Sequence, residues 1–388
     1  MATVTSDAAG RLGREAARIG EEVAGPAADD VDRKARFPSE AMEAMRSARM
    51  LSVLVPPDLG GDGVSVGAVA EAVGALARHC ASTAMVYAMH QMQVACLVRH
   101  GRSDVLRDFQ RALVDGQLLL ASATTEIGVG GDIRTSVCAV EERDGRFTLE
   151  KKAPVISYGE NADAVLATAR RSPESPPNDQ VLVLCTAPGL ALEATSGWDT
   201  LGFRGTCSLG FSLQAEGDVR QVLDDPFSEI ASRTMLPVSH VLWSSVWLGL
   251  ASAAVDRARR FVRTEARKNP GVTSPAAVRL SELMTVFQQM EALVHGAART
   301  YDEVYDDLET LSGMGFAIAM NGLKVSASTL VVDIVGRALT ICGIAGYRED
   351  SAYSLGRLLR DAHGAAVMVN NDRIIANNAQ MLLVHKED

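Results

Sequence analysis

The stretch from Thr125 to Asp132 reads Thr-Glu-Ile-Gly-Val-Gly-Gly-Asp, and it follows an apolar run at 118–123 that is typical of a β-strand. Three of its eight residues are glycine, which has no side chain to hold the backbone away from a ligand. Two more glycine-rich turns follow, at Gly202–Gly205 and at Gly343–Tyr347. Turns of this kind predict that the backbone approaches a polyanionic cofactor closely.

The pattern of the sequence changes on either side of this stretch. Helical periodicity returns after the strand-like middle part, with apolar side chains such as Trp243 and Trp247 spaced three or four residues apart. Several long helices of this type indicate a bundle. We therefore predict a mainly helical α+β chain with an N-terminal helical domain (1–117), a middle β-barrel or β-sandwich domain (118–232) and a C-terminal four-helix bundle (233–388).

Composition excludes several classes of partner. The net charge of −10 comes without a basic stripe long enough to follow a phosphate backbone, which argues against nucleic acid. The longest apolar stretches, such as Val241–Val255, contain serine and are shorter than a bilayer requires. The N-terminus carries charged residues where a signal peptide would have an apolar run. We therefore expect a cytoplasmic protein with no nucleic-acid or membrane partner.

Six cysteines lie at positions 80, 96, 138, 185, 207 and 342, without a Cys-x-x-Cys pair or a histidine at metal-ligand spacing. This pattern predicts neither a disulfide scaffold nor a metal site. We interpret the cysteines as reduced side chains that mostly pack in the core.

The glycine-rich turns and the order of helices, strands and helices together resemble the flavin-dependent acyl-CoA dehydrogenase superfamily. The resemblance covers nearly the whole chain, from Phe37-Pro38 to Arg373-Ile374. It implies that FAD lies between the middle and C-terminal domains. It also implies that a neighbouring subunit completes the dinucleotide site, so that the protein is a homotetramer or homodimer.

The stretch from Thr125 to Asp132 is similar to the family's Thr-Glu-Pro-Gly-x-Gly-Ser-Asp loop, in which the backbone and the Thr hydroxyl hold the flavin. Ile127 and Gly131 stand in place of Pro and Ser, which loosens the turn and removes one hydroxyl. The resemblance implies cofactor contacts by Thr124, Thr125, Gly130 and Gly131.

A second segment, Val155-Ile156-Ser157, resembles the family's Trp-Ile-Thr segment. Ser157 keeps the hydroxyl that lies against the flavin in relatives. Val155 lacks the ring that covers one side of the isoalloxazine.

The C-terminal domain resembles the family at two further positions. Arg267 matches an arginine that pairs with the cofactor's pyrophosphate, a task that suits the bidentate guanidinium, although a solvated helix end is the alternative. Gly343 and Gly346 match a turn that packs against the adenosine half of a neighbouring subunit's flavin, with Ile344 in place of another glycine. For Gly202–Gly205, a turn without any ligand contact is an equally good interpretation.

Dehydrogenation of an acyl thioester needs a base for the α-proton, while the flavin takes a hydride from the β-carbon. The two positions where relatives carry the catalytic Glu match Val369 and Ser239, and neither is a carboxylate. Three substitutes are visible: His240, Asp372 and His90. Their structural alternatives are a histidine bonded to a backbone carbonyl, a helix N-cap and a core histidine, respectively.

Two activities therefore remain open. The Thr-Glu-x-Gly loop favours a dehydrogenase that acts on an acyl-CoA or acyl-carrier-protein thioester and passes electrons to a flavoprotein acceptor. The alternative is a monooxygenase of the same fold that takes reduced flavin from a reductase and uses O2, in which His90 matches a histidine near the flavin. The arginines at 257, 259, 260 and 263 could dock a carrier protein, although a solvated helix face is the simpler interpretation.

Overall fold

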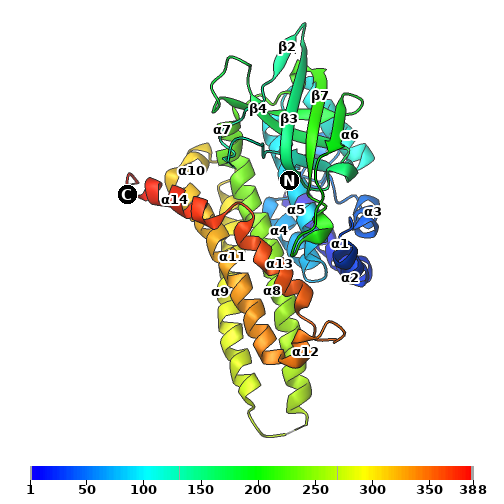
Figure 1. The fold of residues 1–388 in the computed structure, drawn as a ribbon, viewed down its shortest axis with the longest axis vertical. Coiled ribbons are helices and arrows are strands. Elements are labelled where there is room, and N and C mark those ends of the chain that lie inside the picture. The colour runs from blue at the N-terminus through cyan, green and yellow to red at the C-terminus, as the bar shows by residue number, and fades with distance from the viewer. Residues whose placement is uncertain (1, 131, 269, 386–388) are drawn as a thin grey trace.

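The computed structural model describes residues 2–130, 132–268 and 270–385, arranged in three regions along the chain (Figure 1). The N-terminal region is helical, and α5 is buried along almost its whole length because its sequence is apolar on nearly every face. Its helices are α1 (Ala2–Ile19), α2 (Gly25–Lys34), α3 (Ser39–Ser47), α4 (Val66–Ala77), α5 (Ala81–His100) and α6 (Asp104–Gly116).

The middle region contains two sheets with the strand orders β1-β4-β5 and β2-β3-β7-β6. Strand β1 pairs with β4 in parallel, and the other pairings are antiparallel. Along β3 exposed and buried residues alternate, as expected for a strand with one face on a core. The strands are β1 (Leu120–Ala123), β2 (Glu141–Arg143), β3 (Arg146–Ile156), β4 (Ala164–Arg170), β5 (Gln180–Thr186), β6 (Leu190–Ala194) and β7 (Leu209–Asp218).

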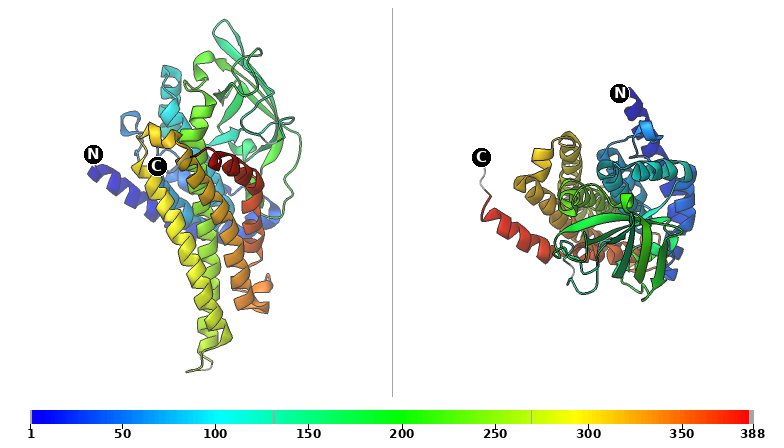
Figure 2. Two further views of the ribbon diagram at one scale, coloured as in Figure 1. Left: turned by 90° about the vertical axis from the view of Figure 1, so that its left-hand side faces the viewer. Right: turned by 90° about the horizontal axis from the view of Figure 1, so that it is seen from above.

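The C-terminal region is built on three long helices, with α13 packed against α11 and α8 as the fourth member of the bundle. In Figure 1 the long helices run side by side away from the sheets, and Figure 2 shows α14 and the N-terminal helices on opposite sides. The helices are α7 (Phe227–Ile230), α8 (Leu236–Ala266), α9 (Pro275–Glu303), α10 (Leu308–Ser312), α11 (Met314–Cys342), α12 (Ile344–Tyr347), α13 (Gly356–Val367) and α14 (Asn371–Leu382).

The fold class predicted from the sequence is confirmed. The predicted boundary at 117–118 falls in the connection between α6 and β1. The boundary at 232–233 falls inside the helical segment that begins at Phe227 and leads into α8. All six cysteines are free, and all but Cys207 are buried, as predicted.

Among the described residues, two helical segments are long and apolar enough to cross a bilayer by length and hydropathy alone, contrary to the expectation from the sequence. In Phe227–Ala266, 89% of the apolar window is buried inside the protein, which is the property of a core helix. In Met314–Cys342 the buried share is 44%. The exposed positions of α11 are mostly polar, among them Ser326, Asp333 and Arg337.

The turn at Gly202–Gly205 joins all three regions. The backbone N–H of Phe203 donates to the buried Asp361 carboxylate on α13 at 2.7 Å, and Arg204 donates to the Asp32 carbonyl on α2 at 2.9 Å. A Cβ at Gly202 would lie 2.3 Å from the Arg360 carbonyl oxygen, so only glycine fits there. These contacts agree with the interpretation of Gly202–Gly205 as a turn without any ligand contact.

Candidate functional site

A buried ion pair anchors the start of the glycine-rich loop. Glu126 lies 3.3 Å from the Lys151 ammonium, and its carboxylate also accepts the backbone N–H groups of Val137 and Cys138. Lys151 is fully buried and donates in addition to the Thr168 carbonyl at 2.8 Å. With these bonds the two charges are satisfied inside the middle region, and the loop leaves the sheet at a fixed position.

Beyond Glu126 the loop exposes its backbone. Gly128 and Gly130 have φ values of +103° and +60°, which side chains other than glycine adopt only with strain. A Cβ at Gly130 would meet no atom within 4 Å, so the space above it is open. The Gly130 carbonyl accepts a 2.6 Å hydrogen bond from Arg373 of α14. Gly131 lies outside the described residues.

The loop and the Val155–Ser157 segment lie side by side, as the resemblance implies. The Thr125 hydroxyl donates to the Val155 carbonyl at 3.0 Å, and Thr124 is half-buried at the end of β1. Ser157 is buried, and its hydroxyl begins a chain through Ser208 and Thr206, each step measuring 2.8 Å.

The direction of this hydroxyl chain follows from its last partner. Thr206 also lies 2.9 Å from the Phe203 carbonyl, which can only accept, so Thr206 donates to it. The chain then runs from Ser157 to Ser208 to Thr206. Ser157 therefore keeps its lone pairs free to accept a hydrogen bond from a ligand.

Polar atoms without a partner gather on one buried face of α8, formed by His240, Trp243, Ser244 and Trp247, here called the α8 cluster. Within the described residues, His240 Nε2, the two indole N–H groups and the Ser244 hydroxyl have no hydrogen bond. The His240 and Trp243 rings lie 6.3 Å apart. Buried polar atoms are rarely left unpaired in native proteins, so this face is a candidate ligand site.

The tautomer of His240 is fixed by the hydrogen bond at its other ring nitrogen. Nδ1 lies 3.1 Å from the Met320 carbonyl, which can only accept, so Nδ1 carries the proton and Nε2 carries a lone pair. Burial, reinforced by the nearby Lys324 charge, lowers the His240 pKa to about 4. The ring is neutral at pH 7.

Val369 and Ser239, the positions of the expected carboxylates, are both held by local contacts. Val369 has a φ of +48°, a left-handed conformation that a β-branched residue adopts only under strain. Lys324 of α11 holds it there, donating to the Val369 carbonyl at 2.7 Å and to the Asn371 side chain at 2.7 Å. Ser239 is buried, and its hydroxyl donates to the Leu236 carbonyl.

Lys324 joins the start of α14 to the α8 cluster. Its ammonium lies 5.7 Å from the Trp247 ring centre, and burial lowers its pKa to about 8. The same helix α14 contacts the glycine-rich loop through Arg373, which donates to the Gly130 carbonyl. This is the boundary between the middle sheets and the bundle, where the resemblance places the flavin.

The other two proposed bases lie in different surroundings. Both ring nitrogens of His90 are engaged, by the Leu51 carbonyl at 2.7 Å and by the Leu120 N–H at 3.0 Å, as in a core histidine. Asp372 is exposed in the first turn of α14. The sequence alternative of an N-cap at Asp372 is wrong, because the cap is the Asn370 side chain, which accepts the Asp372 N–H.

The remaining predicted cofactor residues lie at the far end of the bundle. Arg267 ends the 31-residue helix α8, and the helix rise places it roughly 45 Å from the start of that helix. Gly343 has a φ of +57° at the end of α11, and Gly346 lies in α12. Ile344 and Tyr347 beside them are each 74% exposed. Figure 1 shows α12, which holds Gly346, toward the end of the bundle that points away from the sheets.

Sequence reasoning missed both buried lysines. Lys151 gave a detectable signal, because it occupies an inward position of the alternating strand β3. Lys324 gave a weaker one, as the single charged residue in the first 19 residues of α11. Neither signal identifies a partner.

The residues present fit a flavin. The open backbone at Gly130, the accepting hydroxyl of Ser157 and the unpaired polar atoms of the α8 cluster offer both hydrogen-bond acceptors and donors. Within the described residues there is no group of three histidine, cysteine or acidic side chains that could hold a metal.

Comparison with known proteins gives a consistent result. The model of the acyl-CoA dehydrogenase N-terminal domain matches residues 7–117, and that of the acyl-CoA dehydrogenase C-terminal domain matches residues 230–372. The cyclohex-1-ene-1-carbonyl-CoA dehydrogenase of Geobacter metallireducens is 24% identical, over 90% of both chains. The dibenzothiophene monooxygenase of Mycolicibacterium goodii is 23% identical, over 79% of both. The FMN-bound TdsC of Paenibacillus sp. A11-2 superposes with a TM-score of 0.82 at 19% identity, covering 98% of both chains.

Proposed function

Because the chain belongs to the acyl-CoA dehydrogenase family, we propose that it is an FAD-dependent oxidoreductase that desaturates an acyl thioester of CoA or of a carrier protein. The relative from Geobacter metallireducens, whose name specifies a CoA thioester, supports this substrate class. A flavoprotein or a reductase serves as the electron partner.

The unpaired Nε2 of His240 is the observation that carries the proposal. It is a buried, neutral acceptor with a lone pair on the α8 cluster, and its tautomer is fixed by Met320. It takes the α-proton of the thioester, and the enolate charge that forms offsets the new imidazolium beside Lys324. A bound flavin supplies the acceptor for the hydride that leaves the β-carbon, so the substrate gains a carbon–carbon double bond.

The chain's other residues orient the cofactor. Thr124, Thr125 and Gly130 hold one side of the flavin, and Ser157 accepts a hydrogen bond from it. Arg267, Gly343 and Gly346 serve the flavin of a neighbouring copy, because they lie at the far end of the bundle. The protein is therefore a homodimer or homotetramer, and the exposed apolar residues Ile344 and Tyr347 support such an interface.

Anaerobic mixing of the purified flavoprotein with acyl-CoA and acyl-carrier thioesters tests this function. We expect at least one thioester to bleach the flavin colour. His240→Gln should retain flavin but bleach at least about 100-fold more slowly, the usual contribution of a general base. His363→Gln, which changes an exposed histidine on α13, should bleach at the wild-type rate. Bleaching of His240→Gln at the wild-type rate, or a protein that purifies without flavin, would contradict the proposal.

The alternative function is a monooxygenase of the same fold, which needs no α-proton base. One observation favours it: valine and serine, each held by local contacts, occupy the two family positions for the carboxylate. The relative from Mycolicibacterium goodii shows that the family includes such enzymes. Flavin that bleaches only with a reductase, followed by transfer of isotope from labelled O2 into a product, would identify this activity.

We also propose that the protein works in the cytoplasm. Its six free cysteines and its net charge of −10 suit that compartment.

A further inference from the structure

A hollow of about 630 Å³ lies on α8 where that helix meets α2, α13 and the end of α4. We call it the arginine groove. It is lined by Arg78, Arg257, Arg259, Arg260, Arg263 and Arg357, together with Asp29, Asp256 and His79. Six arginines against two aspartates leave an excess of four positive charges, in a chain whose net charge is −10.

Only part of this charge is neutralised by neighbours. Arg78 pairs with Asp256 at 2.6 Å, and Arg357 pairs with Asp29 at 3.1 Å. Arg259 lies 3.9 Å from the same Asp256 and donates to the Met284 sulfur. In the part of the chain that the structure describes, the side chains of the three remaining arginines, at 257, 260 and 263, make no ion pair or hydrogen bond.

The unpaired Arg257 is half-buried beside other cations. Burial, and then the charges of Arg357 and Arg260, lower its pKa to about 10. The same burial lowers the pKa of His79. Cations gathered in a partly buried hollow repel one another, and an anion bound there would relieve that repulsion.

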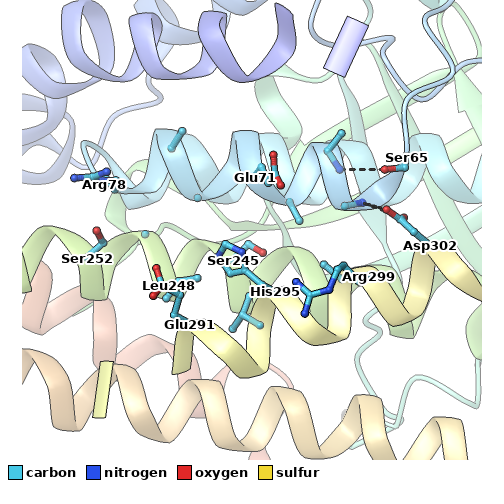
Figure 3. A pocket seen from close by; sticks show the side chains of 18 of the residues that line it. Ser65, Glu71, Arg78, Ser245, Leu248, Ser252, Glu291, His295, Arg299 and Asp302 are labelled. Carbon is cyan, nitrogen blue, oxygen red and sulfur yellow. Dashed lines mark hydrogen bonds between the residues drawn. The ribbon is translucent and has the colours of Figure 1, made fainter. Parts of the chain in front are cut away.

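A neighbouring hollow shows that this charge excess is local. The hollow between α4 and α9, of about 550 Å³, shares Arg78 with the arginine groove. Figure 3 shows Glu71 and Glu291 in it alongside His295 and Arg299, so both signs of charge are present there. The positive excess is a property of the arginine groove.

The spacing of the unpaired arginines sets the size of the ligand. Positions 257, 260 and 263 follow one face of α8 and extend over about 9 Å at the helix rise. Guanidinium groups grip phosphate oxygens in bidentate forks, and a row of three extends beyond one phosphate. We propose that the arginine groove binds a polyphosphate group, such as that of a nucleoside di- or triphosphate.

The arginine groove is separate from the glycine-rich loop of the proposed flavin site. The arginine groove faces α2 and α4 of its own N-terminal region, whereas the glycine-rich loop contacts α14 through Arg373. Arg267, the residue proposed for the cofactor pyrophosphate, does not line the groove. We infer that the ligand is additional to FAD, and the flavin content of the groove variant tests this.

Calorimetric titration of the flavin-loaded protein with inorganic tripolyphosphate, and then with ATP, tests the proposal. We expect saturable binding that weakens as salt rises. The double substitution Arg260→Gln with Arg263→Gln should weaken binding at least about tenfold, since even one charge-assisted hydrogen bond contributes that much. Both residues are exposed, so the variant should fold normally. The matched control, Arg279→Gln with Arg299→Gln, removes two exposed arginines from α9 and should bind like wild type.

Three outcomes would overturn the proposal. The first is that the wild-type protein fails to bind tripolyphosphate at low salt. The second is that the control substitutions weaken binding as much as the groove substitutions. The third is that the groove variant loses both flavin and polyphosphate binding, which would assign the arginines to the diphosphate of FAD. The flavin content of each variant, read from its visible absorbance, separates this last case from a failure of the proposed oxidoreductase function.

Discussion

The neutral state of His240 predicts a specific loss of stability in acid. Its pKa is about 4 in the folded protein and about 6.5 when unfolded. Above pH 6.5 neither state binds the proton and the residue contributes no pH dependence. Between pH 6.5 and pH 4 only the unfolded chain is protonated, so the folded state loses stability as the pH falls. The loss is about 2 kcal/mol at pH 5 and approaches about 3 kcal/mol below pH 4.

Urea unfolding at pH 8 and pH 5, followed by tryptophan fluorescence, measures this effect. Trp243 and Trp247 lie on the same helix face as His240 and report the transition directly. His240→Gln keeps an amide N–H for the Met320 carbonyl but cannot titrate. The difference in unfolding free energy between the two pH values should be about 2 kcal/mol smaller in this variant than in wild type.

His90 provides an internal comparison, because burial also lowers its pKa to about 4 and it should add a loss of similar size that His240→Gln leaves in place. His363→Gln should show the full wild-type pH dependence, since His363 is exposed. If His240→Gln were as sensitive to acid as wild type, the pKa of His240 would be the same in the folded and unfolded states. The depressed pKa that burial is expected to impose on the native ring would then be excluded.

Three further predictions follow from the buried lysines and from the far end of the bundle. Lys324→Met should lower the free energy of unfolding by roughly 3 kcal/mol, because it removes the hydrogen bonds to Ala365, Val369 and Asn371. A melting temperature within about 1 °C of wild type would contradict this prediction. Lys151→Met should lower the free energy of unfolding by about 3–5 kcal/mol, because it leaves the Glu126 carboxylate buried without its cation. Adding Glu126→Gln to this variant should recover part of that loss, as measured by urea unfolding. Arg267→Ala should lower the flavin-to-protein ratio after gel filtration, and the melting temperature should fall with the lost flavin because a bound cofactor stabilises the folded state; an unchanged ratio would assign Arg267 to a solvated helix end.

The fold could be predicted from the sequence because its signals are local. The change of period near residue 118, the alternation along β3 and the glycine-rich turns each depend on neighbouring residues in the chain. The same holds for the contact between Thr125 and the Val155 segment, which the family resemblance implies.

The chemical state of the site could not be predicted in this way. His240 is neutral because it is buried, and Met320, 80 residues away, fixes its tautomer by accepting from Nδ1; nothing near either residue in the sequence indicates that contact. Asp372 was a candidate base from its distance in sequence to Val369, yet the turn at Asn370 directs the helix start outward. The arginines after position 256 were interpreted as a solvated face, since the sequence does not show α2 and α13 approaching them.

The contact between Gly202 and the Arg360 carbonyl has a consequence for how substrate reaches the interior. The turn packs so tightly against α13 that a Cβ at Gly202 would lie 2.3 Å from the Arg360 carbonyl oxygen. Asp361 and Asp32 also accept hydrogen bonds from this turn, so the sheets and the bundle are in direct contact here. These contacts restrain movement of the middle region against the bundle at this turn. We expect substrate to reach the α8 cluster through rotamer changes and small shifts of helices rather than through a large domain opening.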